Sequence, residues 1–325
     1  MISFEPHPLL RSGHAMTVAA ALLPRRFDIP PAEPRRFQVD KDSRLLGHCH
    51  WQPGKTKHAP VLVLVHGLEG SSDSNYMRGI AEKAFRRAFH VVRLNQRNCG
   101  GTEALTPTLY NSGMSADYGA VFEELSKADG FEQIFFAGYS MGGNLVTKMA
   151  GEFAEAAPNA LRAVCAVCPA LDLAACADAL ERTENLLYQR RFVSSLMDRY
   201  VRKQKLFPER YPLNGLPPIR TLREFDDVIT APQFGYRDAH EYYEHASAKR
   251  LAAKIRVPFL MITAQDDPFV PYASFAEARI GDNPSIRLMA PRHGGHCGFI
   301  AKHSGAERFW AEQRIVDFCQ AHATG

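Results

Sequence analysis

The stretch Phe135-Phe136-Ala137-Gly138-Tyr139-Ser140-Met141-Gly142-Gly143-Asn144 determines how the rest of the chain is interpreted. The apolar run at residues 134–137 predicts a buried strand, and a helix-forming run follows at residues 144–153. Gly-x-Ser-x-Gly between a strand and a helix is typical of a nucleophile elbow, a turn so tight that small neighbours are needed to avoid clashes. We therefore predict that the Ser140 hydroxyl stands clear of the backbone, near the positive end of a helix dipole.

The composition is that of an ordinary folded protein with a full core. Of its 325 residues, 46% are hydrophobic and 23% are charged, as in globular domains generally. A net charge of +4 is too small to indicate nucleic-acid binding. No apolar stretch approaches the roughly 20 residues of a membrane span, so we expect no stable membrane insertion. The apolar run at residues 15–23 is expected to pack on the domain, with peripheral lipid contact as the alternative.

The seven cysteines are spread over predicted strands, helices and loops, which suits free thiols in a reducing cytosol. Residues 1–6 show no signal-peptide pattern, and we therefore predict a cytoplasmic protein. Cys165 and Cys168 form a C-x-x-C, but they lie in a predicted core strand, and no second Cys or His pair occurs at zinc spacing. We expect no metal site and no cofactor.

The alternation of strands and helices predicts the fold class. Residues 60–65 are continuously apolar and β-branched, which indicates a strand buried on both faces, as in a parallel sheet. Helices alternate with strands at crossover spacing up to residues 161–167, and the alternation resumes at residues 258–321. The pattern predicts an α/β protein with a mostly parallel, doubly wound sheet. Two antiparallel strands, at residues 37–40 and 45–51, are expected before it.

The alternation stops at residues 172–250, where helical pieces, several prolines and many aromatic and charged residues occur. We interpret this segment as a helical cap or lid insertion over the C-terminal edge of the sheet, where open α/β sheets bind ligands. The core then comprises residues 36–171 and 251–325. Residues 1–35, rich in proline and arginine and irregular, are expected to form an N-terminal arm across the domain.

A reactive serine needs a general base, and the base needs a carboxylate that orients it. Both residue types follow Ser140 in the expected chain order, each on a loop after a predicted strand. The Asp-Pro-x-Val-Pro register favours Asp267 as the acid, with Asp266 as the alternative. Glycines before His296 let its loop approach the elbow, which favours His296 over His293 as the base.

A transition-state oxyanion needs fixed N–H donors. One predicted donor is the amide of Met141, directly after the nucleophile. The other is the amide of Leu68, in the loop after an early strand, where Gly67 allows the turn. His66 is then expected to bond loop carbonyls instead of acting as a base. This loop lacks the Lys and Ser/Thr of a phosphate-binding P-loop.

Together the motifs resemble the YheT-like branch of the α/β-hydrolases, which is related to the eukaryotic abhydrolase-domain lipid hydrolases. The resemblance extends from about Pro34 to Ala321 and implies an α/β-hydrolase fold, with Ser140 as nucleophile, Asp267 as acid and His296 as base. General hydrolases do not share the block at residues 223–231. The motifs that carry the resemblance are residues 66–71, 138–144, 223–231 with Gly235-Tyr236 and Tyr242-Tyr243, 266–269, and 293–300.

These residues predict a cofactor-independent serine hydrolase that cleaves carboxylic esters through an acyl-enzyme. We expect short- to medium-chain acyl groups, lipid-derived ones included, and a small-molecule ester as the partner; the oligomeric state stays open. The alternatives are an acyltransferase, thioesterase or amidase with the same residues, or a binding protein on an inactive hydrolase fold. In the 223–231 block, we expect Arg223 and its acidic neighbours to form ion pairs that pin the cap around a buried Phe225. Binding of a substrate carboxylate or phosphate by Arg223 is the alternative.

Overall fold

The computed structural model describes residues 3–54 and 56–324. Within them, one eight-stranded sheet has the strand order β1-β2-β4-β3-β5-β6-β7-β8. The pairs β1–β2 and β2–β4 are antiparallel and the remaining pairs are parallel, which confirms the predicted α/β class. The strands are Glu33–Asp40 (β1), Ser43–His50 (β2), Val61–Val65 (β3), His90–Asn95 (β4), Ile134–Tyr139 (β5), Leu161–Val167 (β6), Phe259–Ile262 (β7) and Ile286–Met289 (β8).

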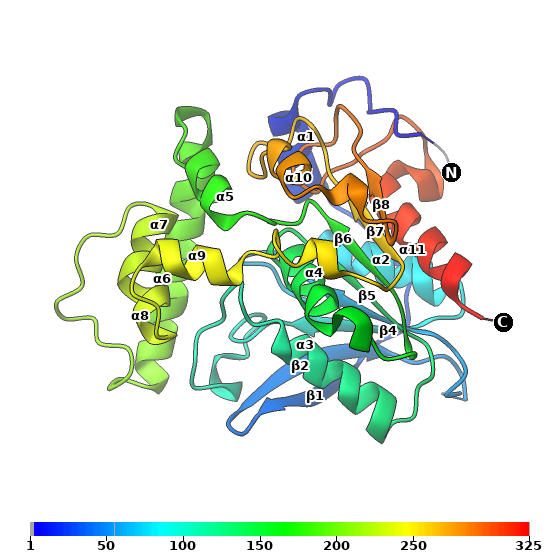
Figure 1. Cartoon of the computed structure of the whole chain (residues 1–325), viewed down its shortest axis with the longest axis horizontal. Coiled ribbons are helices and arrows are strands. Elements are labelled where there is room, and N and C mark those ends of the chain that lie inside the picture. The colour runs from blue at the N-terminus through cyan, green and yellow to red at the C-terminus, as the bar shows by residue number, and fades with distance from the viewer. Residues whose placement is uncertain (1–2, 55, 325) are drawn as a thin grey trace.

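Helices cover both faces of the sheet (Figure 1). On one face, α2 (Asn75–Phe85) and α11 (Trp310–His322) contact each other and pack against the strands. On the opposite face lie α3 (Ala116–Glu123) and α4 (Met141–Phe153). Every residue of β3 and β5 is buried, as the continuous apolar runs of these central parallel strands require.

A helical segment separates β6 from β7 and lies to one side of the sheet (Figure 1). Its two ends are adjacent, because the Lys249 amide donates to the Leu171 carbonyl at 3.0 Å and the Leu173 amide donates to Ser247 Oγ at 3.0 Å. The segment is therefore a single excursion from the sheet. Its helices are α5 (Leu173–Leu180), α6 (Leu186–Leu206), α7 (Leu222–Phe225), α8 (Ala231–Gln233) and α9 (Ala239–Ala246), with a π-helical turn (η5) at Asp226–Thr230, and α10 (Ala273–Glu277) follows β7.

The N-terminal region is not irregular throughout, contrary to our expectation. Helix α1 spans Gly13–Leu22, because its alanine-rich sequence has high helix propensity. Buried Met16 holds the helix against the C-terminal part of the chain, and its sulfur accepts from the Ile300 amide at 3.3 Å. No helix in the described ranges is long and apolar enough to cross a membrane.

Candidate active site

Ser140 lies in the turn between β5 and α4, in a backbone conformation that side chains rarely adopt. Its φ is 52° and its ψ is −118°, a strained region for a residue other than glycine. The sharp turn brings the backbone of α4 against the end of β3. A Cβ atom at Gly142 would lie 2.4 Å from the His66 carbonyl oxygen, so only glycine fits there. The elbow thus depends on both residue types, a strained serine and a glycine without a side chain.

The loops after β7 and β8 bring a carboxylate and an imidazole to this serine. His296 Nε2 lies 2.9 Å from Ser140 Oγ. Its other ring nitrogen, Nδ1, lies 2.9 and 3.1 Å from the two carboxylate oxygens of Asp267. With Nδ1–H donating to the carboxylate, the Nε2 lone pair is free to accept the Ser140 proton. The structure therefore brings Ser140, His296 and Asp267 into one hydrogen-bonded chain.

The Asp267 carboxylate is fixed by its own loop. Its side chain is fully buried, and its Oδ1 accepts from the amides of Phe269 at 2.8 Å and Val270 at 3.0 Å. The imidazole is fixed from behind, since the His296 amide donates to Thr17 Oγ1 of α1 at 2.8 Å. The N-terminal helix thus supports the loop that carries the imidazole, a contact that the sequence pattern did not indicate.

The alternative acid and base form a separate pair. His293 Nδ1 lies 3.3 Å from Asp266 Oδ2, and the His293 side chain is 41% exposed. Asp266 Oδ1 accepts from the Gly295 amide at 2.9 Å, so this carboxylate holds the glycine turn just before His296. Within the described ranges no hydrogen bond joins His293 or Asp266 to Ser140.

The imidazole and the neighbouring thiol have displaced pKa values. Burial alone lowers the pKa of His296, but the charges of Asp267 and Cys297 raise it well above 6.5. Burial would raise the pKa of the Cys297 thiol, whereas a hydrogen bond with Cys168 and the interactions with His296 lower it to about 6. The two groups are coupled, because a positive charge on His296 lowers the pKa of Cys297 and a negative charge on Cys297 raises the pKa of His296.

Leu68, in the loop after β3, and Met141, the first residue of α4, both line the cavity beside Ser140. Gly67 approaches the elbow so closely that a Cβ there would lie 3.1 Å from Ser140 Cβ. In the described chain, no hydrogen-bond acceptor occupies the amides of Leu68 or Met141. His66 is structural, as expected: its Nδ1 bonds the Gly67 carbonyl at 2.8 Å. Burial lowers the pKa of His66 to about 4, so this ring is neutral.

Glu69, the residue after Leu68, anchors this loop to the helical segment, a feature that no local sequence signal revealed. Arg199 of α6 donates to both Glu69 carboxylate oxygens, from Nε at 2.9 Å and from Nη2 at 3.0 Å. Tyr110 donates to the same carboxylate at 2.6 Å, and Ser195 of α6 donates to it as well. Burial would raise the pKa of Glu69, but these donors, Arg199 above all, hold it below its usual range.

Comparisons with known proteins agree with this fold. The family model of the alpha/beta hydrolase fold matches residues 60–302. YheT of Escherichia coli, which bears the name of an esterase, is 32% identical over 97% of this chain and 92% of its own length. The chain belongs to the α/β hydrolase family, in its YheT-like branch.

Two further proteins resemble this α/β hydrolase. The monoacylglycerol lipase of Saccharomyces cerevisiae is 32% identical over 78% of the chain, and the chain spans 57% of that lipase. The 2,6-dihydroxy-pseudo-oxynicotine hydrolase superposes with a TM-score of 0.62, covering 96% of this chain and 72% of its own. Because its identity is 17%, this second likeness concerns the fold alone.

A cavity of about 100 Å³ in the hydrolase adjoins Ser140 and His296. The helical segment provides most of its wall, through apolar residues of α5, α6 and α7. Polar side chains also line it, among them Asn111, Ser112 and Thr230. The buried Asp226 carboxylate of η5 is another, accepting from Tyr243 at 2.8 Å. The cavity wall includes Leu68, Met141, Leu173, Ala177, Leu180, Phe192, Leu196, Phe225, Asp226, Tyr243, Phe269 and Val270.

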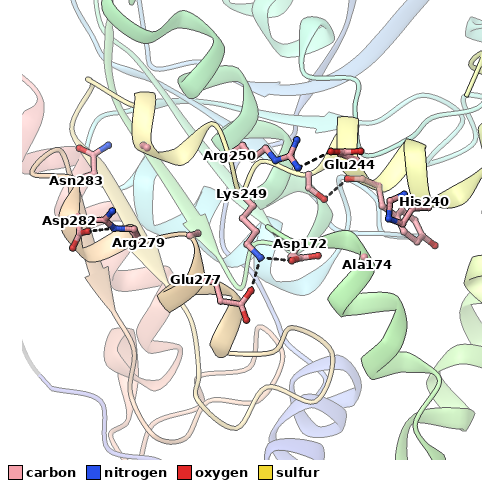
Figure 2. Close-up of a pocket in the computed structure, with 14 residues that line it drawn as sticks. Asp172, Ala174, His240, Glu244, Lys249, Arg250, Glu277, Arg279, Asp282 and Asn283 are labelled. Carbon is pink, nitrogen blue, oxygen red and sulfur yellow. Dashed lines mark hydrogen bonds and ion pairs between the residues drawn. The ribbon is translucent and has the colours of Figure 1, made fainter.

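A larger cleft of about 580 Å³ lies elsewhere on the hydrolase, between α9, α10 and the ends of the helical segment. Figure 2 shows that its charged side chains pair with one another. Lys249 lies 2.8 Å from Asp172 and 2.6 Å from Glu277, and Arg250 pairs with Glu244. Lys249 thus joins the two ends of the helical segment, and Ser140 is not among the residues that line this cleft.

We expected Arg223 to pair with acidic residues of its own block, 223–231, and this prediction is wrong. Phe225 is buried, as expected. Arg223 instead pairs with Asp178 of the neighbouring α5 and with Glu181 directly after that helix, the latter at 3.2 Å. Glu224 closes a capping box with Thr221 at the start of α7. The reason is helical geometry: adjacent residues of one helix point in different directions, so their charges find partners on other elements.

Proposed function

We propose that this α/β hydrolase is a serine esterase in which Ser140, His296 and Asp267 act as the catalytic triad. The observation that carries the proposal is the continuous hydrogen-bonded chain, at 2.9 Å from Ser140 Oγ to His296 Nε2 and 2.9 Å from His296 Nδ1 to Asp267. A serine becomes a competent nucleophile when a base with an oriented ring accepts its proton. The strained elbow keeps that hydroxyl at the cavity wall.

The first half of the reaction forms an acyl-enzyme. His296 takes the Ser140 proton while Oγ attacks the ester carbonyl carbon. The carbonyl oxygen then becomes an oxyanion, which the amides of Leu68 and Met141 stabilise. His296 returns the proton to the alkoxide as the C–O bond breaks, and the alcohol leaves.

The second half releases the acid. Water attacks the acyl carbon while His296 accepts its proton, and the same two amides hold the second oxyanion. The bond between the acyl carbon and Ser140 Oγ then breaks, His296 returns the proton to Oγ, and the carboxylic acid leaves. Asp267 keeps Nδ1 protonated and stabilises the imidazolium that forms in each half-reaction. No step needs a group beyond the residues named.

The cavity and the relatives together support the substrate class. A volume of about 100 Å³ beside Ser140 admits a short acyl group, and its mostly apolar wall suits hydrocarbon. The yeast relative is named a monoacylglycerol lipase, so lipid-derived esters belong to the candidates. Because residues of the helical segment form more than half of the wall, we further propose that residues 172–250 act as a cap over the site. Movement of this cap would enlarge the cavity for longer chains.

The deciding experiment measures hydrolysis of nitrophenyl esters of rising acyl length by the wild type and by Ser140→Ala. The wild type is expected to prefer short to medium chains, and Ser140→Ala to lower kcat by roughly 10³- to 10⁶-fold. A fluorophosphonate probe should label the wild type at Ser140 and leave the variant unlabelled. Wild-type turnover by Ser140→Ala would disprove the mechanism. A folded wild type that the probe does not label would favour a binding protein instead.

A further inference from the structure

The loop of His296 places a pair of thiols beside the imidazole. Cys168 follows β6, and Cys297 directly follows His296. The two thiol sulfurs and a ring nitrogen of His296 all lie within 4.8 Å of one another, the single such group of metal-ligand side chains in the described chain. The Cys168 sulfur also contacts the loop backbone, because it accepts from the Cys297 amide at 3.4 Å and lies 3.8 Å from the Gly295 carbonyl oxygen.

We propose that Cys168, Cys297 and His296 form an inhibitory site for a thiophilic divalent cation of the zinc class. Zinc binds thiolate at about 2.3 Å and imidazole nitrogen at about 2.0 Å, so its ligand atoms lie about 3.5 to 3.8 Å apart. The observed separations, at most 4.8 Å, reach this spacing when the side chains move by about 1 Å. Water or the Ser140 hydroxyl fills the fourth tetrahedral position.

The ligand chemistry selects the class of cation. Two sulfurs and one imidazole nitrogen are soft to intermediate ligands, which suit zinc or cadmium and disfavour magnesium or calcium. Each thiol releases its proton as its sulfur bonds the cation, and His296 contributes a nitrogen lone pair. No oxidant or reductant takes part, so the site fills and empties with the free cation concentration.

Occupation of this site excludes catalysis because both ring nitrogens of His296 are already in use. If Nε2 binds the cation, it no longer accepts the proton of Ser140, which lies 2.9 Å away. If Nδ1 binds, it gives up the hydrogen bond to Asp267. Either bond removes the general base, and the cation and the ester therefore compete for one histidine.

The sequence offers a built-in comparison. The C-x-x-C spacing pairs Cys165 with Cys168, but in the fold the Cys165 sulfur faces Cys319 at 4.0 Å. That second pair is buried and lies outside the metal-ligand group. It therefore contains two thiols without a third ligand and serves as an internal control.

The experiment uses the reduced, metal-free full-length protein. Zn²⁺ is expected to inhibit ester hydrolysis, and a chelator to restore it. Cd²⁺ is expected to give an ultraviolet thiolate-to-metal absorption band and to protect two thiols from a thiol reagent. Measured relative to each variant's own activity without metal, Cys168→Ser and Cys297→Ser should raise the Zn²⁺ concentration for half-inhibition by about tenfold or more, since even losing an outer partner costs that much affinity. Cys319→Ser should behave like the wild type.

Two results would overturn the site: an unchanged Zn²⁺ response in Cys297→Ser, or a wild type without the Cd²⁺ band. Cys297 is partly exposed, so its variant decides the question even if the buried Cys168→Ser fails to fold. The band and the thiol protection require no turnover. They therefore remain measurable if the esterase proposal fails, and the two proposals can be rejected separately.

Discussion

Arg199 of α6 holds Glu69, the residue next to Leu68, through two hydrogen bonds of 2.9 and 3.0 Å. The two residues are 130 positions apart, and both side chains are more than nine-tenths buried. Arg199 also donates to the Asn98 carbonyl, so one guanidinium joins the helical segment to two loops of the core. The position of the Leu68 amide therefore depends on the segment inserted between β6 and β7.

Arg199→Leu tests this dependence. Removing one partner of a buried ion pair leaves an uncompensated charge, so we expect the free energy of unfolding to fall by about 3 to 5 kcal/mol. We also expect kcat for ester hydrolysis to fall, because the Leu68 amide loses its support. Urea unfolding and steady-state kinetics measure the two effects.

Arg202→Leu is the matched control for this change. Arg202 lies one turn further along α6 and pairs with Glu103 at 2.7 Å, but its side chain is half-exposed. Such a pair contributes about 1 kcal/mol or less. Equal destabilisation by the two variants would show that Arg199 has no special role.

Asp267→Asn and Asp266→Asn separate the two adjacent carboxylates. In Asp267→Asn the amide no longer holds the His296 ring in its productive tautomer, so we expect kcat to fall by about 10⁴-fold. Asp266→Asn keeps an oxygen that can accept from the Gly295 amide, and its effect should stay below about 100-fold. If the larger loss follows Asp266→Asn instead, the roles are reversed.

The pH dependence of kcat/KM reports the ionisation of His296. Burial lowers the pKa of His296, but Asp267 and Cys297 raise it well above 6.5. The base acts in its neutral form, so kcat/KM should rise with pH and its acid limb should lie above pH 6.5. Removing the Asp267 carboxylate removes stabilisation of the imidazolium, and the limb of Asp267→Asn should move to lower pH. A limb that stays in place would assign the titration to another group.

Asp226 is expected to make the stability pH-dependent. Burial raises its pKa to about 7 from 3.8, although bonds from Thr230 and Tyr243 oppose the rise. Between those two values the unfolded chain loses this proton while the folded chain keeps it. Stability should therefore decrease as the pH rises from about 4 to 7, by up to about 1.4 kcal/mol per pH unit.

Asp226→Asn removes this ionisation and keeps an acceptor for Tyr243. The unfolding free energy of Asp226→Asn minus that of the wild type should therefore be larger at pH 8 than at pH 5, as measured by urea unfolding. Asp227→Asn is the control, because its exposed side chain accepts from the amide of Ala239, the first residue of α9. A pH response that is identical in the wild type and Asp226→Asn would contradict the prediction.

The fold could be predicted from the sequence because its signals are local. Continuous apolar runs such as Val61–Val65 indicate strands covered on both faces, and the spacing of strands and helices allows few topologies. Ser140, Asp267 and His296 each follow a predicted strand of the parallel sheet, so we expected them on loops at the same edge of that sheet. Helix α1 was missed, since the surrounding prolines and arginines concealed its short alanine-rich run.

The sequence alone thus identified the candidate residues of the site, through the elbow at residues 135–144 and the later aspartate and histidine loops. The tertiary structure alone decided their distances, the separation of Asp266–His293 from Asp267–His296, and the pairings Glu69–Arg199 and Cys168–Cys297. These contacts join residues that are about 30 to 130 positions apart. Local periodicity carries no information about such pairs, because side chains on separate elements meet only when the whole core packs.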